Sequence, residues 1–571
     1  MAAGWIRSSG SGYGFMADSL FSARKNSFNW PALLLAAVIA VPSLGVVWSA
    51  GAAALHAQAW SALWRDPQLP PALAMTLWTG LAATGLSVVL AALMLSFSFP
   101  GARWERMVKA LAPMLAVPHA AFAIGLAFLI APSGWLLRAF SPWATGFGAP
   151  PAWPTTQDPG GLGLIAVLVA KEVPFLLWAA ATQLRRADTA ARWARELDVA
   201  TSMGYAPRTA WWRIVWPQLW PRLGGPMLAV LAYSLTVVDM ALVIGPTTPP
   251  TLAVLAWQWL LDADAAINTQ GAAASWLLAS VVAALAAGLW ALPGLLRLRS
   301  RWTNGQRGTS SQGLYSGPVV LVALAAQPAI YLAVMLALAV GSVSGVWPFP
   351  RLLPDSFSWQ GWQSVFASAS TVWTTCGLAF ISSVTALAWS VAWLEYAPAH
   401  RDTQLRRLIY LPLLLPSVLW VVGLHRLSLV WGLDGHWSGL WLAHSLAATP
   451  YVLIALSPAY LNFDTRYASI AASLQKSRWL FLARIKWPLL KASLTAALAV
   501  GFAVSVAQYL PTLFVGAGRF VTVTTEAVTL ASGAQRSLTA AYAWLQWLLP
   551  ALMFGAAAWA GRPRHFSRAP A

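Results

Sequence analysis

RIVWP at residues 213–217 and RIKWP at residues 484–488 are two copies of one pattern, 271 positions apart in a chain of 571 residues. The same shift, without a gap, also carries Gly245 onto Gly516. One match of this kind can arise by chance. A single register that holds from residue 201 to residue 251 predicts that a structural unit is used twice.

The composition indicates what kind of unit is repeated. Hydrophobic residues make up 58% of the chain and charged residues only 9%, and the mean hydropathy is +0.62. A soluble globular chain has roughly 25% charged residues, so this chain has too few charges to cover several water-soluble domains. Intrinsic disorder needs low hydrophobicity and high net charge, and it is excluded by the same figures.

Runs of about 20 apolar residues, the length needed to cross the hydrocarbon core as a helix, occur twelve times. The predicted spans are 30–51, 73–99, 110–132, 161–184, 223–246, 272–296, 318–347, 370–394, 408–431, 437–461, 492–516 and 538–560. They are continuous apolar runs, not the alternating pattern of a membrane β-barrel. The predicted fold class is therefore an all-α polytopic membrane protein with about 12 transmembrane helices.

The positive charges predict the orientation of these spans. Of the 36 Lys and Arg residues, 29 lie in the two tails and the loops on one side, five lie in the opposite loops, and two lie within spans. Because Lys and Arg concentrate on the cytoplasmic side of membrane proteins, both termini are predicted to be cytoplasmic. The same rule accounts for the net charge of +19, which in a soluble protein would suggest nucleic-acid binding. Residues 1–29 lack an apolar run, so the first span is expected to be an uncleaved anchor.

Two loops on the predicted cytoplasmic side are long and basic, at residues 185–222 and 462–491. Each is the fourth connection within a group of six spans. A polar, arginine-rich stretch joins the two groups. We therefore predict two tandem six-helix units, residues 1–310 and 311–571.

The first long loop carries a family pattern. Asp198, Ala200, Gly204, Ile214 and Pro217 have the spacing of the sequence E-A-A, three residues, G, nine residues, I-x-x-P. This loop resembles the EAA loop of ABC importer permeases, where it precedes the penultimate span. Over essentially its whole length, the chain looks like two such permease halves fused into one.

The second copy of the pattern is degenerate. Ala471, Ile485 and Pro488 match the pattern, whereas Gln475 stands in place of the glycine and the acidic residue is missing. The run from residue 512 to residue 527 looks like the fused permeases of the ferric-iron and thiamine importer group.

The resemblance implies a function and a set of partners. The chain would be the transmembrane channel subunit of an ATP-driven solute importer in the bacterial inner membrane. A periplasmic binding protein would deliver the solute, and two copies of a cytoplasmic ABC ATPase would dock on the two loops. Membrane lipid would surround the chain, and ATP would bind to the partner, so no cofactor is expected on this chain.

The local chemistry of the first loop agrees with a docking element. Residues 189–203 contain no proline or glycine and have apolar residues at helical spacing, which predicts a short amphipathic helix. Gly204 is expected to end this helix in a left-handed conformation, and a second helix, about 208–216, is expected to end at Pro217. Because a left-handed conformation is costly for Gln475, the second loop is expected to turn differently and to make an unequal ATPase contact.

A few charged and polar residues lie within predicted spans, where each is costly and usually faces a partner or a cavity. Lys171 and Glu172 lie in span 4, Asp239 in span 5 and Gln508 in span 11. They are candidates for lining a substrate pathway, and pairing between helices is the alternative role. His444 in span 10 has the same two alternatives.

The chain lacks the motifs of an enzyme. None of the six lysines lies in a phosphate-binding loop, the histidines show no zinc-binding spacing, and Cys376 is the only cysteine. We therefore predict a non-catalytic transport subunit without a metal site. A twelve-span secondary transporter is the alternative function, and a membrane-embedded lipid or cell-wall enzyme is a third. No residue selects a solute among thiamine-like cations, ferric iron and polyamines.

Overall fold

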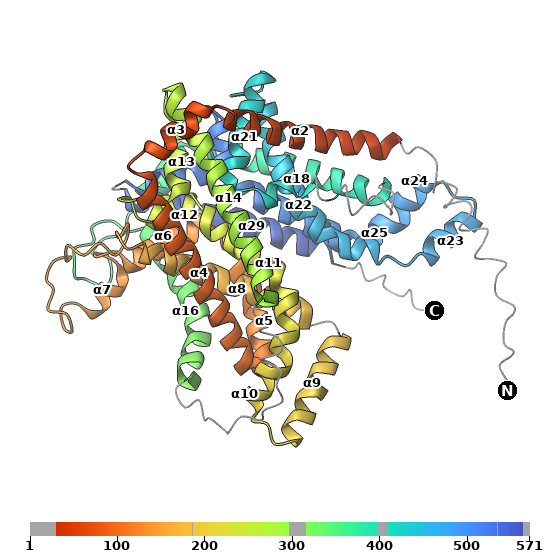
Figure 1. Cartoon of the computed structure of the whole chain (residues 1–571), viewed down its shortest axis with the longest axis horizontal. Coiled ribbons are helices and arrows are strands. Elements are labelled where there is room, and N and C mark those ends of the chain that lie inside the picture. Colours follow the sequence, from red (N-terminus) through yellow and green to blue (C-terminus); the bar gives the residue numbers. More distant parts are fainter. Residues whose placement is uncertain are drawn as a thin grey trace.

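The computed structural model describes residues 30–184, 187–295, 316–396, 406, 409–533 and 535–562. Within these residues the fold is helical, and the one β-type pairing is an isolated bridge between Ser344 and Phe357. Figure 1 shows the helices in chain order. The first part of the chain contains α2 (Trp30–Ala54), α3 (Ala57–Arg65), α4 (Leu69–Ser98), α5 (Ala102–Leu115), α6 (His119–Ile130), α7 (Trp135–Phe140), α8 (Leu162–Leu184), α9 (Ala187–Ser202), α10 (Pro207–Ala210), the π-helical turn η1 (Trp211–Val215), α11 (Trp216–Thr236), α12 (Asp239–Ile244), α13 (Leu252–Leu260) and α14 (Ala265–Leu295).

The second part begins with α16 (Ser316–Ser342). It continues with α17 (Gln360–Ala367), α18 (Ala369–Tyr396), α20 (Leu411–Leu414), α21 (Ser417–Val430), α22 (Trp437–Leu461), α23 (Arg466–Ser473), α24 (Arg478–Phe481), the π-helical turn η2 (Leu482–Lys486), α25 (Trp487–Leu489), α26 (Lys491–Val506), α27 (Leu510–Val515), α28 (Val523–Ala531) and α29 (Arg536–Ala560). The boundary predicted between residues 310 and 311 lies outside the described residues.

Nine helices of the described residues are long and apolar enough to cross a membrane, or ten if one bent pair counts as a single span. They correspond to nine of the twelve predicted spans. The other three, at 223–246, 408–431 and 492–516, are not single long helices. The first of them divides into α11 and α12, the second contains the shorter α21, and the third divides into α26 and α27. The chain is thus an all-helical membrane protein in which several spans are interrupted.

The interruptions expose backbone groups that helices normally satisfy internally. At the end of α11, the carbonyl of Thr236 accepts a hydrogen bond from the hydroxyl of Ser417 at 3.3 Å. At the end of α26, the carbonyl of Val506 accepts one from the hydroxyl of Thr524. Such substitute donors are needed because an unsatisfied carbonyl is costly at membrane depth. Side chains from elsewhere in the fold therefore make the breaks tolerable.

The backbone repeats with the shift found in the sequence. The elements α10, η1, α12 and α13 begin and end 271 residues before α24, η2, α27 and α28. A tertiary hydrogen bond repeats as well. The N–H of Leu252 donates to the hydroxyl of Thr76 at 2.7 Å, and the N–H of Val523 donates to that of Thr375 at 2.9 Å. The two copies therefore share local geometry and packing.

The first helix of each copy packs against the other copy. In Figure 1, α2 (red) lies along α21 and α18 of the second part, and these pairs are in contact. By the same relationship, α16 packs on α6 and α4 of the first part. Glycines allow both contacts, because Gly423 of α21 lies against Val46, and Gly125 of α6 lies against Val334. This exchange ties the two parts together.

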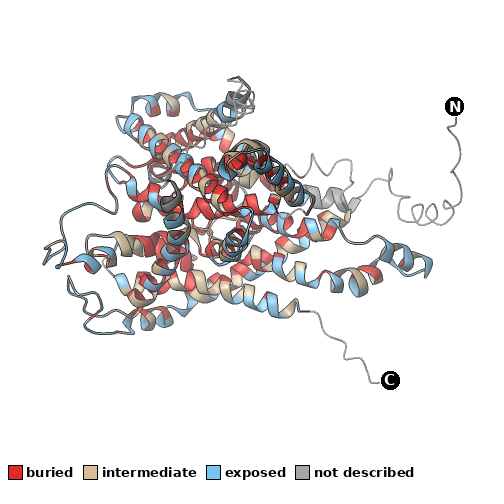
Figure 2. Cartoon of the chain, turned by 90° about the horizontal axis from the view of Figure 1, so that it is seen from below, coloured by how far each residue is buried: buried red, intermediate tan, exposed pale blue. Residues whose placement is uncertain are grey.

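Buried residues concentrate in the centre of the molecule, as Figure 2 shows. The largest hydrophobic cluster contains residues of both copies, among them Phe122 and Ile244 from the first and Phe514 and Val523 from the second. Away from this centre the copies diverge. The pair α9 and α10 and the pair α23 and α24 lie at well-separated positions in Figure 1. The two long loops therefore occupy separate ends of the molecule.

Candidate functional site

The first loop has the predicted helix and cap. Helix α9 ends at Ser202, and Gly204 follows with φ of +88°. The N–H of Tyr205 donates to the carbonyl of Ala200 at 3.1 Å, which closes the last turn in the manner of a Schellman motif. The motif residues Ala200 and Gly204 thus build one helix end together.

The second loop makes the same turn, so the prediction that it turns differently is wrong. Gln475 adopts φ of +52°, and the N–H of Lys476 donates to the carbonyl of Ala471 at 3.0 Å. This hydrogen bond compensates for the cost of a left-handed conformation in a residue other than glycine. The degenerate sequence therefore preserves the backbone of Gly204.

The prediction that a helix ends at Pro217 is also wrong. Helix α10, the turn η1 and α11 follow one another without interruption up to Thr236, and Pro217 lies at the start of α11. A proline inside a helix clashes with the carbonyl four residues earlier. Here that carbonyl belongs to Arg213, which lies in the wider π-helical turn together with Ile214.

The second loop has the matching π turn, with Ile485 in η2 and Pro488 in α25. It differs afterwards. The helical segment Arg478–Leu489 bends by 78° against Lys491–Val506, whereas the first copy continues as one helix. The asymmetry between the loops thus lies beyond the proline and not at the turn.

The start of α23 is fixed by an exposed ion pair. Asp464 accepts hydrogen bonds from the backbone N–H of Arg466 at 2.9 Å and from its guanidinium at 2.9 Å. The guanidinium hydrogen bonds lower the pKa of the Asp464 carboxyl. An exposed pair of this kind contributes little to global stability, so its effect is local to the beginning of the helix.

The alanines of the motif face inward. Ala200 and Ala471 are 5% and 3% exposed, whereas Asp198 is exposed. Met203, which the helical pattern places on the apolar inner face together with Trp193, is exposed instead. The residues available to a partner are therefore not the alanines.

Two exposed apolar side chains occur at matching positions of both loops. In the first they are Val199 and Met203, with exposed fractions of 58% and 53%, and in the second Ile470 and Leu474, with 56% and 62%. Members of each pair are four residues apart, so they lie on one side of the helix end. Sequence reasoning did not identify these pairs, although the shift of 271 residues aligns Val199 with Ile470 and Met203 with Leu474.

Gln218 fastens the first loop to α11. Its amide oxygen accepts from Arg192 at 2.8 Å and from the indole N–H of Trp193 at 2.9 Å. Its amide nitrogen donates to Glu196 at 2.8 Å and to the carbonyl of Ile214 at 2.9 Å. One neutral side chain thus holds α9 against the start of α11. The sequence pattern carries no signal for it.

The charged residues within spans are buried near the centre. Lys171 and Glu172 of α8 are 3% and 5% exposed. The ammonium of Lys171 donates to the carbonyl of Val117 at 2.7 Å, in the break between α5 and α6. It also lies 5.6 Å from the ring centre of Phe122 and 5.5 Å from that of Tyr331. The ammonium of Lys171 therefore satisfies a carbonyl at an interruption of the helical backbone.

The remaining candidates lie at the other breaks. Asp239 is half-buried at the first residue of α12, and Gln508 is half-buried between α26 and α27. Gln508 thus lies in the second copy of the break at which Asp239 begins α12.

His444 has a structural position. Its Nδ1 lies 2.8 Å from the hydroxyl of Ser505, and its Nε2 lies 3.0 Å from that of Thr512. Both ring nitrogens are therefore used to join α22 to α26 and α27. Among the described residues, no group of three or more His, Cys, Asp and Glu side chains is placed to hold a metal ion.

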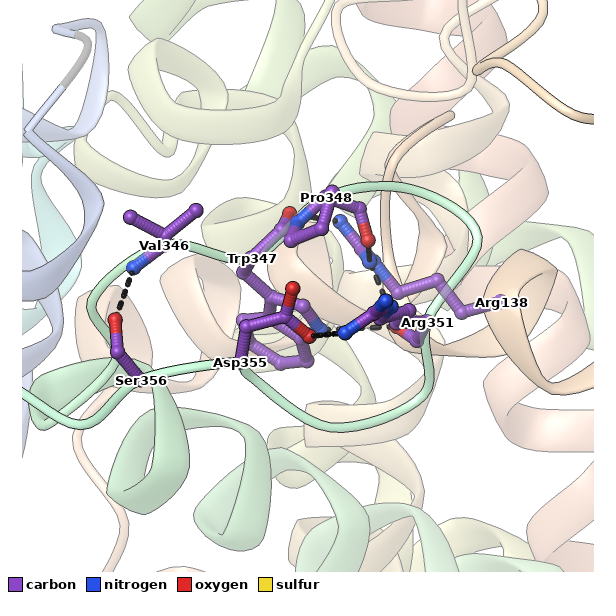
Figure 3. Close-up of polar contacts among 7 residues, drawn as sticks. All are labelled: Arg138, Val346, Trp347, Pro348, Arg351, Asp355 and Ser356. Carbon is purple, nitrogen blue, oxygen red and sulfur yellow. Dashed lines mark hydrogen bonds and ion pairs between the residues drawn. The ribbon is translucent and has the colours of Figure 1, made fainter.

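A further polar cluster surrounds Arg138 and the residues that it binds (Figure 3). Arg138 of α7 is 4% exposed. Its guanidinium donates to the carbonyls of Trp347, Pro348 and Arg351 at 3.1, 2.8 and 2.7 Å. An arginine of the first part thus holds the loop between α16 and α17 of the second part.

A duplicated helical membrane protein with interrupted spans and two matching loops has the architecture of a transport channel. No family model matches the chain. It is 36% identical over 539 residues to the inner membrane ABC transporter permease protein YnjC of Escherichia coli (strain K12), an alignment that covers 93% of this chain and 96% of the relative. The chain therefore belongs to the ABC transporter permeases and is a multi-pass transport subunit of the inner membrane. Its expected place in the ferric-iron and thiamine group stays a prediction.

Proposed function

We propose that the chain is the channel subunit of an ATP-driven importer. It receives solute from a periplasmic binding protein and is driven by two copies of a cytoplasmic ABC ATPase, one on each coupling loop (residues 185–222 and 462–491). Both termini lie in the cytoplasm, and the chain itself performs no chemistry. The supporting observation is the pair of exposed apolar residues at matching positions of the two loops.

The exposed pairs suit a docking role for a physical reason. An apolar side chain that is more than half exposed contributes little free energy to the folded chain, but it stabilises a complex when a partner removes it from water. Val199 with Met203 and Ile470 with Leu474 present such surface on equivalent helix ends. Two equivalent surfaces on one chain favour two copies of one partner.

The test is purification of the tagged chain from its native membrane in mild detergent, with mass spectrometry of the proteins that accompany it. We expect an ABC ATPase at about two copies per chain, from the two equivalent loops. The double variant Val199→Glu/Met203→Glu should reduce this to about one copy, because it puts a charge at each apolar position that the ATPase would bury. Ala191→Glu, an exposed position on the same helix, is the control with the same type of charge change.

A different outcome would replace this proposal. If the chain purifies without an ATPase and moves solute in vesicles under an ion gradient, it is a secondary transporter. If the double variant retains both ATPase copies, the exposed pairs are not the docking surface.

We further propose that Asp239, Glu172, Lys171 and Gln508 line the path of the solute near the breaks of the spans. Discontinuous membrane helices place backbone groups and polar side chains at the midplane, where transporters bind solute. Asp239 is the best position to test because it begins α12 at such a break. Asp239→Asn should reduce uptake without changing the ATPase content of the purified complex. Unchanged uptake would remove Asp239 from the path.

A further inference from the structure

One carboxylate fastens the second coupling loop to two transmembrane helices. Glu395 lies next to the last residue of α18, and its side chain is 9% exposed. Its Oε1 accepts from the ammonium of Lys486 at 2.5 Å and from the hydroxyl of Tyr460 at 2.6 Å, and its Oε2 accepts from Arg478 at 2.9 Å. Arg478 begins α24, Lys486 ends η2, and Tyr460 belongs to α22. The carboxylate thus joins both ends of the loop's short helices to α18 and α22.

The groups around Glu395 are themselves held in place. Arg478 donates a second hydrogen bond to the backbone carbonyl of Glu395 at 2.7 Å. Lys486 lies 4.0 Å from the ring centre of Tyr460, whose hydroxyl also accepts from the indole of Trp487 at 3.1 Å. Charge-assisted hydrogen bonds of this kind are shorter and stronger than neutral ones. Glu395 therefore binds the short helices of the second loop through several strong hydrogen bonds at a largely buried site.

Among the described residues of the first copy, no carboxylate stands in the place of Glu395. The matched hydrogen bonds of Thr76 and Thr375 align α4 with α18, and this alignment puts Ser96 at the position of Glu395. The hydroxyl of Ser96 donates to the carbonyl of Leu93 within its own helix.

The first loop is instead held by Gln218, which joins α9 to α11. The counterpart of Gln218 in the repeat is Leu489, which is 58% exposed. The two loops therefore have the same turn but different anchors. Both loops contact the matched long helix, α4 or α18, through an arginine, because Arg208 lies 3.6 Å from the ring centre of Phe97 of α4 and Arg478 lies 5.0 Å from that of Tyr396 of α18. Only the second loop adds a buried carboxylate, which also reaches α22.

We propose that Glu395 is a positioning residue that transmits movement of the second coupling loop to α18 and α22. The inference rests on the proposed function, because it requires an ATPase that moves the loop. A displacement of α24 and η2 cannot leave α18 and α22 behind while the three donors of Glu395 are in place. Without the carboxylate, Lys486 and Tyr460 lose their shared partner, and Arg478 keeps only its hydrogen bond to the backbone carbonyl of residue 395. Movement of the loop is then transmitted less fully to α18 and α22.

The experiment follows α18 directly and needs no solute. In a Cys376→Ser background, spin labels at Ser370→Cys, near the start of α18, and Ala266→Cys, near the start of α14, report the distance between the copies. The complex with its ATPase is measured with and without MgATP and vanadate, and its ATP hydrolysis rate is measured in parallel. We expect a nucleotide-dependent distance shift that Glu395→Gln strongly reduces while ATP hydrolysis continues. Glu395→Asp, which keeps the charge, should retain part of the shift.

Control variants separate the outcomes. Gln218→Leu installs in the first loop the residue type of the second and should leave the shift at residue 370 intact. If Glu395→Gln fails to fold, Lys486→Gln removes one of the two cations that bind the carboxylate and should reduce the shift. A shift that survives both Glu395→Gln and Lys486→Gln, or that Gln218→Leu abolishes equally, overturns the role of Glu395. A chain that binds no ATPase overturns the proposed function instead.

Discussion

Gly423 of α21 lies directly against Val46 of α2, so close that a Cβ atom at position 423 would come within 2.0 Å of the Val46 carbonyl oxygen. The same contact occurs between Gly125 of α6 and Val334 of α16, where the Cβ would lie 2.6 Å from a methyl group and 3.0 Å from the carbonyl oxygen of Val334. These two crossings join the copies of the repeat, since α2 and α16 each pack on the other copy.

Gly423→Ala should therefore destabilise the protein. The nearest atom is backbone and cannot rotate away, so we expect a loss of about 3 kcal/mol, at the upper end for overpacking. Gly51→Ala in α2 is the control, because its Cβ would meet nothing within 4 Å. Thermal unfolding in mild detergent measures both. Equal midpoints for the two variants would show that α2 can shift to make room.

The left-handed turns predict opposite effects for reciprocal substitutions. Gln475→Gly should stabilise and Gly204→Gln should destabilise, each by about 1 kcal/mol, because residues other than glycine pay for positive φ. A Cβ at position 204 meets nothing within 4 Å, so its cost comes from the backbone alone. Unfolding midpoints of the two variants and of Gln475→Asn give the test, with asparagine expected between glutamine and glycine.

Lys171→Met should cost about 2–3 kcal/mol, because it leaves the buried carbonyl of Val117 without its donor. Tyr331→Phe is the matched comparison. It keeps the ring beside Lys171 and loses only the hydrogen bond from its hydroxyl to the carbonyl of Ala170, at 3.2 Å. We expect this second change to cost less than half as much. A smaller effect for Lys171→Met than for Tyr331→Phe in the same unfolding assay would contradict a structural role for the ammonium.

Arg138→Met should release the loop between α16 and α17. Three carbonyls of residues 347–351 lose their donor, and the loop should then open locally without global unfolding. Faster trypsin cleavage after Arg351 is the expected result. Asp355→Asn breaks only the exposed pair with Arg351 and should change little. Cleavage at the same rate in Arg138→Met and in the unmodified chain would show that other contacts hold the loop.

The coupling loops show how far local sequence reasoning reaches. The helix before Gly204 and its cap follow from residues within one turn of each other, and they were predictable. The turn at Gln475 was not, because the hydrogen bond from Lys476 to Ala471 compensates for the side chain. Val199 and Met203 were missed for a related reason. Helical spacing gives the apolar positions but not which of them a neighbouring helix covers.

The breaks in the spans separate the two kinds of information most clearly. The break before α27 has Pro511 beside it, whereas the equivalent position before α12 is Met240, which does not interrupt a helix. The break before α12 is supported instead by Ser417, which lies far along the chain and donates to the carbonyl of Thr236. A local signal marks one copy, and a distant donor supports the other.

The sequence by itself determined the membrane class, the repeat, and the helix of the first loop with its cap at Gly204, because apolar length and glycine act on their immediate neighbours. Only the tertiary structure decided the exchange of α2 and α16, the interruption at residues 237–238 and the anchoring of the second loop on Glu395. Each of these depends on groups that lie far apart in the chain. Close backbone approach, replacement donors and paired charges arise only when packing brings such groups together.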